Sequence, residues 1–351
     1  MSLQPPGAVG SPSVSASTSP GASRGGTTGG SPGATPAPGS GPGSLEAAYE
    51  QIITKVLPSI VQITTRESLG SGVVYDTAGH IITNAHVVGG SKRFEVTLAT
   101  GGTPRTARLI SSFELGDLAV IKVDDPTGLK PAVFGDSAGL RVGQIVLAMG
   151  NPLGLSGSVT NGIISALGRT VNEPSNETSP GATISGAIQT SAPINPGNSG
   201  GALVNLAGEV IGVPTLTAVN PELGNAQAAG IGFAIPSNTV KDIATQIIRD
   251  GKVTNTHRAA LGVVVRTVID MSGEPAGVSV VRVLKNSGAQ RAGLKAGDLI
   301  ISINGTPTPS TQDLSTVLSS LKPGEDAKVE ILRPDGSRTT LSVPLEELHG
   351  S

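Results

Sequence analysis

The residues best suited to chemistry begin with a serine in a glycine-rich turn. Ser199 lies within Gly197-Asn198-Ser199-Gly200-Gly201. A nucleophilic serine needs an exposed hydroxyl on a tight turn, with backbone N–H groups directed at the oxygen that becomes negative. Glycines permit such a turn and let a substrate chain approach closely. The N–H groups of Gly197 and Ser199, with Asn198 between them, would form this oxyanion hole, although the run also fits a plain hairpin turn.

A base and a group to orient it occur earlier in the chain. His86 follows an apolar segment in Thr83-Asn84-Ala85-His86-Val87-Val88, so we expect it at the end of a strand with its ring facing a cleft. A histidine pKa of about 6.5 suits a general base at neutral pH. Asp117 opens the apolar strand that follows it and could hold the imidazole tautomer. A structural histidine and a turn aspartate are the alternatives, but the order His86, Asp117, Ser199 matches a catalytic triad.

Composition excludes several other classes of function. The chain has 351 residues, 24 basic and 26 acidic, and no basic run longer than Lys92-Arg93. A nucleic-acid partner needs a clustered cationic face, so none is expected. There is no cysteine, and none of the four histidines form an i, i+4 pair. We therefore expect no metal and no cofactor.

The chain divides into a tail and about two domains. Residues 1–44 are rich in Gly, Ser, Pro, Ala and Thr, which predicts disorder. A helix is expected over 45–56 with Ser44 as its N-cap, and two sets of six short strands indicate two antiparallel barrels. The strands are expected at 60–65, 70–75, 81–83, 93–98, 105–111 and 118–123, then 144–149, 158–166, 187–190, 202–204, 210–214 and 230–235.

The C-terminal part carries a different pattern. A helix over 237–250 capped by Ser237 ends at Gly251, and residues 251–258 are polar enough to form a linker. Residues 259–346 alternate strands with one helix over 311–321, which opens near Ser310. Strands are expected there at 262–268, 278–283, 299–303, 328–332 and 339–343.

Several runs resemble the HtrA/Deg family of serine proteases over residues 45–346. They are Thr83–Val88, Asp117–Val120, Gly150–Gly154, Asn195–Leu203 and Gly230–Pro236. The resemblance implies a mainly β fold, in which a chymotrypsin-like double β-barrel (45–250) precedes a small α+β PDZ domain (259–346). It implies His86, Asp117 and Ser199 as the triad.

The resemblance also suggests how substrate is held beside the nucleophile. It implies an apolar S1 pocket that favours Val, Ala, Leu or Ile at P1, and residues 171–185 as a long mobile loop that relays peptide binding. Two positions depart from the family pattern, because Ser191 stands where it usually has Asp and Pro214 where it usually has Asn. These departures bear on specificity and resting activity. The pocket would be lined by Ile194, Val213, Pro214, Thr215 and Leu216.

The run Ala289–Gly305 resembles a PDZ domain closely. It implies that Ala260, Leu261, Gly262 and Val263 form the loop that binds a peptide's terminal carboxylate, with strand addition alongside. Leu314 and Leu318 would flank the hydrophobic pocket, although such leucines can also be core.

Together these features predict an ATP-independent, extracytoplasmic serine endopeptidase of protein quality control. Its expected partners are unfolded or partly folded proteins and C-terminal peptides. A homotrimer or higher oligomer is expected through the segment around Tyr49. Neither a signal peptide nor a membrane span is visible in the sequence, and the tail could follow a membrane tether. The alternative is a peptide-binding chaperone or scaffold with a latent protease site.

Overall fold

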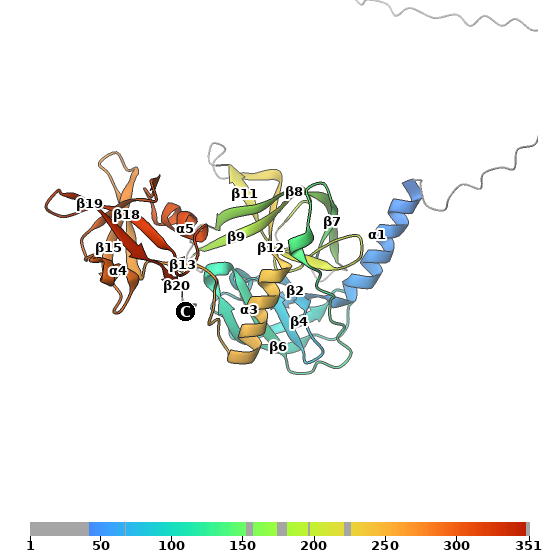
Figure 1. Ribbon diagram of the computed structural model, residues 1–351. Coiled ribbons are helices and arrows are strands. Elements are labelled where there is room, and N and C mark those ends of the chain that lie inside the picture. The colour runs from blue at the N-terminus through green and yellow to red at the C-terminus, as the bar shows by residue number, and fades with distance from the viewer. Residues whose placement is uncertain are drawn as a thin grey trace, which may run out of the picture. The chain divides into compact units, whose positions relative to one another are not determined.

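Two closed β-barrels follow one another along the chain of this computed structural model (Figure 1). The structure describes residues 42–66, 68–151, 157–173, 181–195, 197–220 and 226–348. For residues 42, 216–220 and 226–229 it describes the backbone alone. The first barrel has the order β1-β2-β3-β6-β5-β4 and the second β10-β11-β12-β9-β8-β7, with every pairing antiparallel. The first set is β1 (Ile60–Thr64), β2 (Leu69–Val74), β3 (His80–Thr83), β4 (Arg93–Leu98), β5 (Arg105–Phe113) and β6 (Leu118–Val123). The second set is β7 (Ile145–Gly150), β8 (Ser158–Glu173), β9 (Ala182–Thr190), β10 (Ala202–Val204), β11 (Val210–Asn220) and β12 (Ala226–Pro236).

Helices cover and join the barrels. Helix α1 (Pro42–Val56) precedes the first strand, and the single turn α2 (Ala85–Val88) follows β3. Helix α3 (Ser237–Asp250) contacts strands of both barrels and ends at Gly251, whose φ of 71° lets its N–H reach the Ile247 carbonyl. Ile247 shares one core with Leu118 of the first barrel and Ile235 of the second. Burial of this apolar face therefore holds the two barrels together.

The C-terminal domain is a sheet flanked by two helices. Its sheet has the order β14-β15-β16-β18-β19, which leaves β14 at an edge with one side unpaired. Such an edge offers free backbone groups to an added strand. The elements are β13 (Ala259–Ala260), β14 (Val263–Ile269), β15 (Pro275–Val283), α4 (Gly288–Ala292), β16 (Leu299–Ile303), β17 (Thr306–Pro307), α5 (Thr311–Ser319), β18 (Asp326–Leu332), β19 (Arg338–Pro344) and β20 (Glu346–Glu347).

The mainly β fold predicted from the sequence is confirmed, with differences at particular boundaries. Helix α1 begins at Pro42, so Ser44 lies inside it rather than at its N-cap, and Pro42–Ser44 are helical although the tail was expected to reach residue 44. Ser237 is likewise the first residue of α3, and Pro236 occupies the N-cap. Residues 1–41 lie outside the described part of the chain. Helix α5 ends at Ser319 instead of 321.

The largest difference concerns the loop expected over 171–185. Strand β8 runs to Glu173 and β9 starts at Ala182, and their register pairs Glu173 with Ala182. Backbone pairing therefore continues well beyond the short apolar stretches that signalled these strands. Residues 174–180 lie outside the description. Among the described helices, none is long and apolar enough to cross a membrane.

We predict that Ile247→Ala destabilises the protein strongly, because Ile247 is fully buried where α3 meets both barrels. Truncating a buried isoleucine costs about 2–5 kcal/mol. Ile163→Ala is the matched control, since Ile163 is 41% exposed on β8 and the same atoms are removed. Urea denaturation measures both variants. Equal losses in the two variants would contradict the proposed role of the α3 core.

Candidate active site

Asp117 is a buried carboxylate at the start of β6, with 1% of its surface exposed. A short turn over Glu114–Gly116 delivers it in the left-handed conformation, with φ of 52°, which aspartate tolerates better than most residues. It accepts hydrogen bonds from the His86 backbone N–H at 3.0 Å, from His86 Nδ1 at 3.0 Å and from the Thr215 hydroxyl. A buried charge needs such partners to offset its desolvation.

His86 lies in the single turn α2 rather than at the end of a strand as expected. The turn follows β3 directly, and Asn84 before it anchors to the Asp117 carbonyl through its side-chain amide at 2.9 Å. Burial opposes a charged ring, but the hydrogen bond and charge of Asp117 and the charge of Glu173 together raise the pKa of His86 above its usual value. Asp117 thus fixes the tautomer that leaves Nε2 free to accept a proton.

Ser199 lies on the predicted glycine-rich turn, in the second barrel. Its hydroxyl donates to the Thr215 carbonyl at 3.0 Å, and no hydrogen bond joins it to His86 in the described part of the chain. Gly200 follows with φ of 80°, and a Cβ there would collide with the Ser71 backbone. The turn therefore requires glycine, and it presents Ser199 close to Asp117's partner Thr215.

The backbone N–H groups of Gly197 and Ser199 donate no hydrogen bond within the described residues. They are available to an oxyanion, as an acyl-transfer site requires. Ser71 of the first barrel holds the turn, since its N–H donates to the Ser199 carbonyl at 3.0 Å and its hydroxyl to the Gly197 carbonyl. Asn198 is buried, and its N–H donates to Asn195 at 3.0 Å. No sequence signal marked Ser71, because its partners are distant in the chain.

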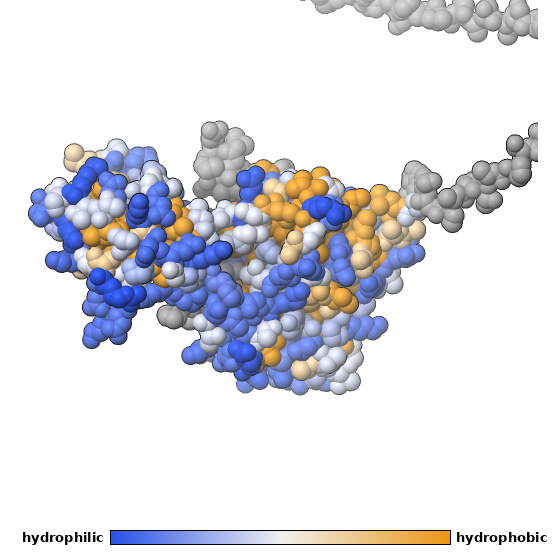
Figure 2. Space-filling view, in the orientation of Figure 1, coloured by the Kyte–Doolittle hydropathy of each residue, from blue (hydrophilic) through white to orange (hydrophobic). Residues whose placement is uncertain are grey.

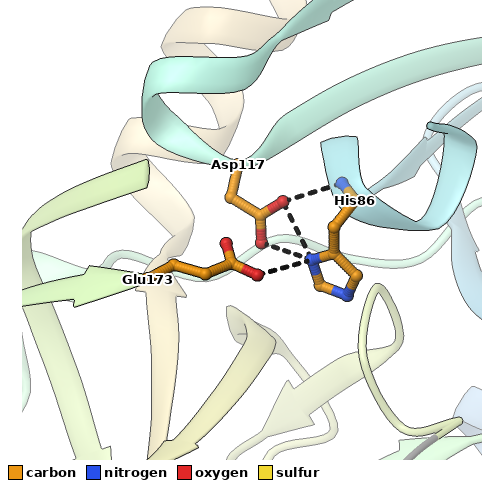
Figure 3. Close-up of side chains that lie close together, drawn as sticks. All are labelled: His86, Asp117 and Glu173. Atoms are coloured by element: carbon orange, nitrogen blue, oxygen red, sulfur yellow. Dashed lines mark hydrogen bonds and ion pairs between the residues drawn. The ribbon is translucent and has the colours of Figure 1, made fainter. Parts of the chain in front are cut away.

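Glu173, at the end of β8, adds a second carboxylate that the sequence analysis did not include. Figure 3 shows it directed at the same ring nitrogen as Asp117, with Oε1 3.7 Å from His86 Nδ1. Burial and the negative charge of Asp117 raise the pKa of Glu173 to about 7, against the opposing effect of His86. Its other oxygen, Oε2, is buried and has no hydrogen-bond partner among the described residues.

The ligand atoms of His86, Asp117 and Glu173 lie within 4.8 Å of one another, as a metal site would require. No other group of described residues has this property. The Asp117 oxygens are already occupied by His86 and Thr215. We therefore assign no metal ligand here, and the described residues offer no other candidate.

Of the residues expected to line S1, Thr215 contacts Ser199 directly, because its carbonyl accepts the Ser199 hydroxyl. Ile194 and Val213 are buried in the barrel cores. The Pro214 carbonyl accepts the Gly200 N–H at 3.0 Å, and Thr215 bridges Ser199 and Asp117. Leu216 pairs with Phe233, and its side chain lies outside the description. The S1 assignment stays a prediction.

Ser191, the other departure from the family pattern, ties β9 to β8. Its N–H donates to the Ile163 carbonyl at 3.1 Å, and its hydroxyl accepts the Ile163 N–H at 3.0 Å. The N–H and hydroxyl of Ser191 are thus hydrogen-bonded to backbone groups rather than to substrate.

The six residues expected to bind a peptide lie around one cavity of about 720 Å³. The N–H groups of Leu261 and Gly262 donate no hydrogen bond within the described chain, so both can receive a carboxylate. Arg258 of the linker also lines the cavity, and donates to the Leu115 carbonyl at 2.8 Å. The lining set is Ala260, Leu261, Gly262, Val263, Leu314 and Leu318.

The strand ends next to the triad are hydrogen-bonded to helix α5. Asn172 donates to the Thr316 hydroxyl at 2.8 Å, and the Thr183 and Ser315 hydroxyls lie 2.9 Å apart. Helix α5, which lines the peptide cavity, is therefore in direct contact with β8, the strand that carries Glu173.

Comparisons with known proteins agree with this arrangement. Residues 70–213 match the trypsin-like peptidase domain, and residues 259–345 match the PDZ domain. The chain is 40% identical over 291 residues to the serine protease Do-like HtrB of Bacillus subtilis, covering 77% of this chain and 60% of that protein. It is 38% identical over 284 residues to the periplasmic serine endoprotease DegP of Escherichia coli, covering 80% of this chain and 57% of DegP. This chain thus spans less than two thirds of either relative.

Two solved structures share the fold over nearly their whole length. The HtrA-type protease AlgW with a decapeptide has 30% identity and a TM-score of 0.57, covering 86% of this chain and 98% of AlgW. The serine endoprotease from Yersinia pestis has 33% identity and a TM-score of 0.56, with the same coverage of 86% and 98%.

We predict that the stability of the wild-type protein falls relative to Glu173→Gln as pH rises from about 4.5 to about 7. A folded-state pKa raised above the unfolded value stabilises the fold only while the group holds its proton, so the contribution is lost as pH rises through the folded pKa. Thermal unfolding of both proteins across this range measures the difference. A constant difference in Tm from pH 4.5 to 8 would contradict the raised pKa of Glu173.

Proposed function

Because this chain belongs to the HtrA family of trypsin-like serine proteases with a PDZ domain, we propose that it is an ATP-independent serine endopeptidase of protein quality control. It hydrolyses peptide bonds of misfolded or tagged proteins. The observation that supports this best is the buried Asp117, which binds both the base His86 and Thr215, the residue that contacts Ser199. We propose domain limits of 45–250 for the protease, 251–258 for the linker and 259–346 for the PDZ domain.

Catalysis requires one rearrangement. The Ser199 hydroxyl leaves the Thr215 carbonyl and donates to His86 Nε2, which takes the proton as Oγ attacks the substrate carbonyl. Asp117 stays ionised and stabilises the imidazolium, while the N–H groups of Gly197 and Ser199 bind the oxyanion. His86 then protonates the leaving amine, and water releases the acyl group by the reverse sequence.

A second function is supported by the orientation of Ser199. Its hydroxyl faces Thr215 rather than His86, as in a protein whose protease site rests in a latent state. Such a chain would act as a peptide-binding chaperone or scaffold. Reaction with a fluorophosphonate separates the two functions, because only a serine activated by its base is labelled quickly.

The cavity between β14 and α5, called the groove below, supports binding of a C-terminal peptide. The peptide would add to the free edge of β14, and its carboxylate would meet the N–H groups of Leu261 and Gly262, with the Arg258 guanidinium nearby. Its terminal apolar side chain would lie between Leu314 and Leu318. Beside Ser199, the S1 pocket lined by 194 and 213–216 would take a small or branched apolar side chain.

We further propose a homotrimer or higher oligomer in an extracytoplasmic compartment. Hydrophobic residues gather on the protease face beside α1 (Figure 2), and exposed apolar side chains there and on the second barrel include Leu45, Ile163 and Leu167. Tyr49 lies on the same helix and is partly exposed. The location rests on relatives named as periplasmic endoproteases.

We predict that Ser199→Ala abolishes proteolysis and fluorophosphonate labelling while the fold and peptide binding persist. Removing a triad nucleophile typically costs about 10⁶ in kcat. Asp117→Asn should lower kcat by about 10⁴, the value known for another enzyme with this mechanism, because the tautomer of His86 is lost. Cleavage of unfolded casein and circular dichroism measure both effects. More than about one hundredth of wild-type cleavage by Ser199→Ala would show that the nucleophile is misassigned.

We also predict that a peptide with a free, apolar C-terminus raises kcat/KM for a short chromogenic substrate that cannot reach the groove. The contacts between α5 and the ends of β8 and β9 supply the route. Typical coupling is about 5- to 150-fold. An amidated peptide is the control, since the N–H cradle then loses its anion. A flat response to saturating free-acid peptide would leave the PDZ domain as a tether that only concentrates substrate.

A further inference from the structure

Glu173 places a carboxyl group beside the base, and the mechanism above does not use it. Its Oε1 lies 3.7 Å from His86 Nδ1, on the side of the ring that Asp117 occupies (Figure 3). Its side chain is 16% exposed, and Oε2 has no hydrogen-bond partner in the part of the chain that the structure describes. A buried carboxylate in this state is costly unless a nearby cation compensates it. Among the described residues, His86 forms an ion pair with Glu173 when its ring is protonated.

Charged and titratable groups lie near Glu173 on several elements of the fold. Asp117 faces it from the start of β6 and His86 from α2, all within 4.8 Å. Arg258 of the linker lines the same cavity, together with Lys285, Glu346 and Glu347. Asp117 repels the Glu173 charge, so the pair of carboxylates favours an added proton on the cluster.

We propose that Glu173 is a positioning residue that restrains the base, holding His86 as an imidazolium turned toward two carboxylates until a peptide in the groove draws Glu173 away. This inference rests on the proposed protease function and names the group that regulates it. An imidazolium cannot accept the Ser199 proton, so the hydroxyl remains on the Thr215 carbonyl, as observed.

The position of Glu173 in the fold connects the restraint to the groove. The neighbouring Asn172 is bonded to Thr316 of α5 and also accepts a hydrogen bond from Thr183 at 2.8 Å. Glu173 itself lines the peptide cavity together with Leu314 and Leu318. A peptide that shifts α5 or fills the cavity therefore changes the separation of Glu173 from His86.

The direct test measures the titration of His86 by NMR, with 13C-labelled histidine in a Ser199→Ala background that cannot digest itself. The chain has four histidines, so the signals can be assigned by substitution. Glu173→Gln should lower the pKa of His86 by about one unit, the smaller end of the effect of an adjacent charge. His80, paired with Asp76 at 2.7 Å, is the internal control and should not move. An unchanged His86 titration would overturn the proposal.

The kinetic test uses the same substitution in the active protein. The acid limb of kcat/KM should move to lower pH, giving an increase of about fivefold one pH unit below the wild-type midpoint. A peptide with a free C-terminal carboxylate should then raise kcat/KM of the Glu173→Gln variant only a little. Glu95→Gln, the same change at an exposed residue of β4, should retain the wild-type profile and peptide response. If Glu173 had a purely structural role, Glu173→Gln would lower the plateau of kcat/KM without shifting the acid limb of its pH profile.

The proposed protease function and the restraint by Glu173 can be refuted separately. If wild type neither cleaves casein nor reacts with a fluorophosphonate at any pH, the proposed function fails. If wild type is active but the Glu173→Gln profile superimposes on it, the restraint by Glu173 fails and the protease function stands.

Discussion

A single buried carboxylate organises the active site, and its burial determines what must surround it. Asp117 is almost fully enclosed, so its charge requires donors on every side. The donors come from two barrels, His86 from the first and Thr215 from the second. The same Thr215 holds the Ser199 hydroxyl through its carbonyl. The partners of one ion therefore position the proposed base His86 and, through Thr215, the hydroxyl of the proposed nucleophile Ser199.

The seam between the barrels has a second fixed point at Ser71. This residue binds the Ser199 and Gly197 carbonyls with its N–H and hydroxyl, and its own carbonyl accepts the Thr83 hydroxyl at 2.7 Å. Ser71 thus holds the backbone of the turn that carries the proposed oxyanion N–H groups, whereas the Ser199 side chain is held by one hydrogen bond to the Thr215 carbonyl. Preorganised donors with one movable hydroxyl suit a site that switches between resting and active forms at low energetic cost.

Local signals predicted most of the fold and singled out the proposed triad residues, but they did not indicate what surrounds those residues. Short apolar stretches between turn residues located the strands, and α5 opens near Ser310 as expected, with Ser310 as its N-cap. The turn α2 carrying His86 is too short to show a helical period. Glu173 was absorbed into an expected loop because strand pairing beyond Ala166 depends on partners in β9. Side chains that act across distant segments, such as Ser71, leave no periodic signal.

In the proposed mechanism, Ser199, His86, Asp117 and the Gly197 N–H act on one reacting carbon. A crystal structure of the protein after reaction with diisopropyl fluorophosphate measures this directly. The account predicts phosphorus bonded to Ser199 Oγ, its oxygen accepting from the N–H groups of Gly197 and Ser199, and His86 Nε2 turned to Oγ with Nδ1 still on Asp117. Phosphorylation of another residue, or an oxygen directed away from those N–H groups, would contradict the account.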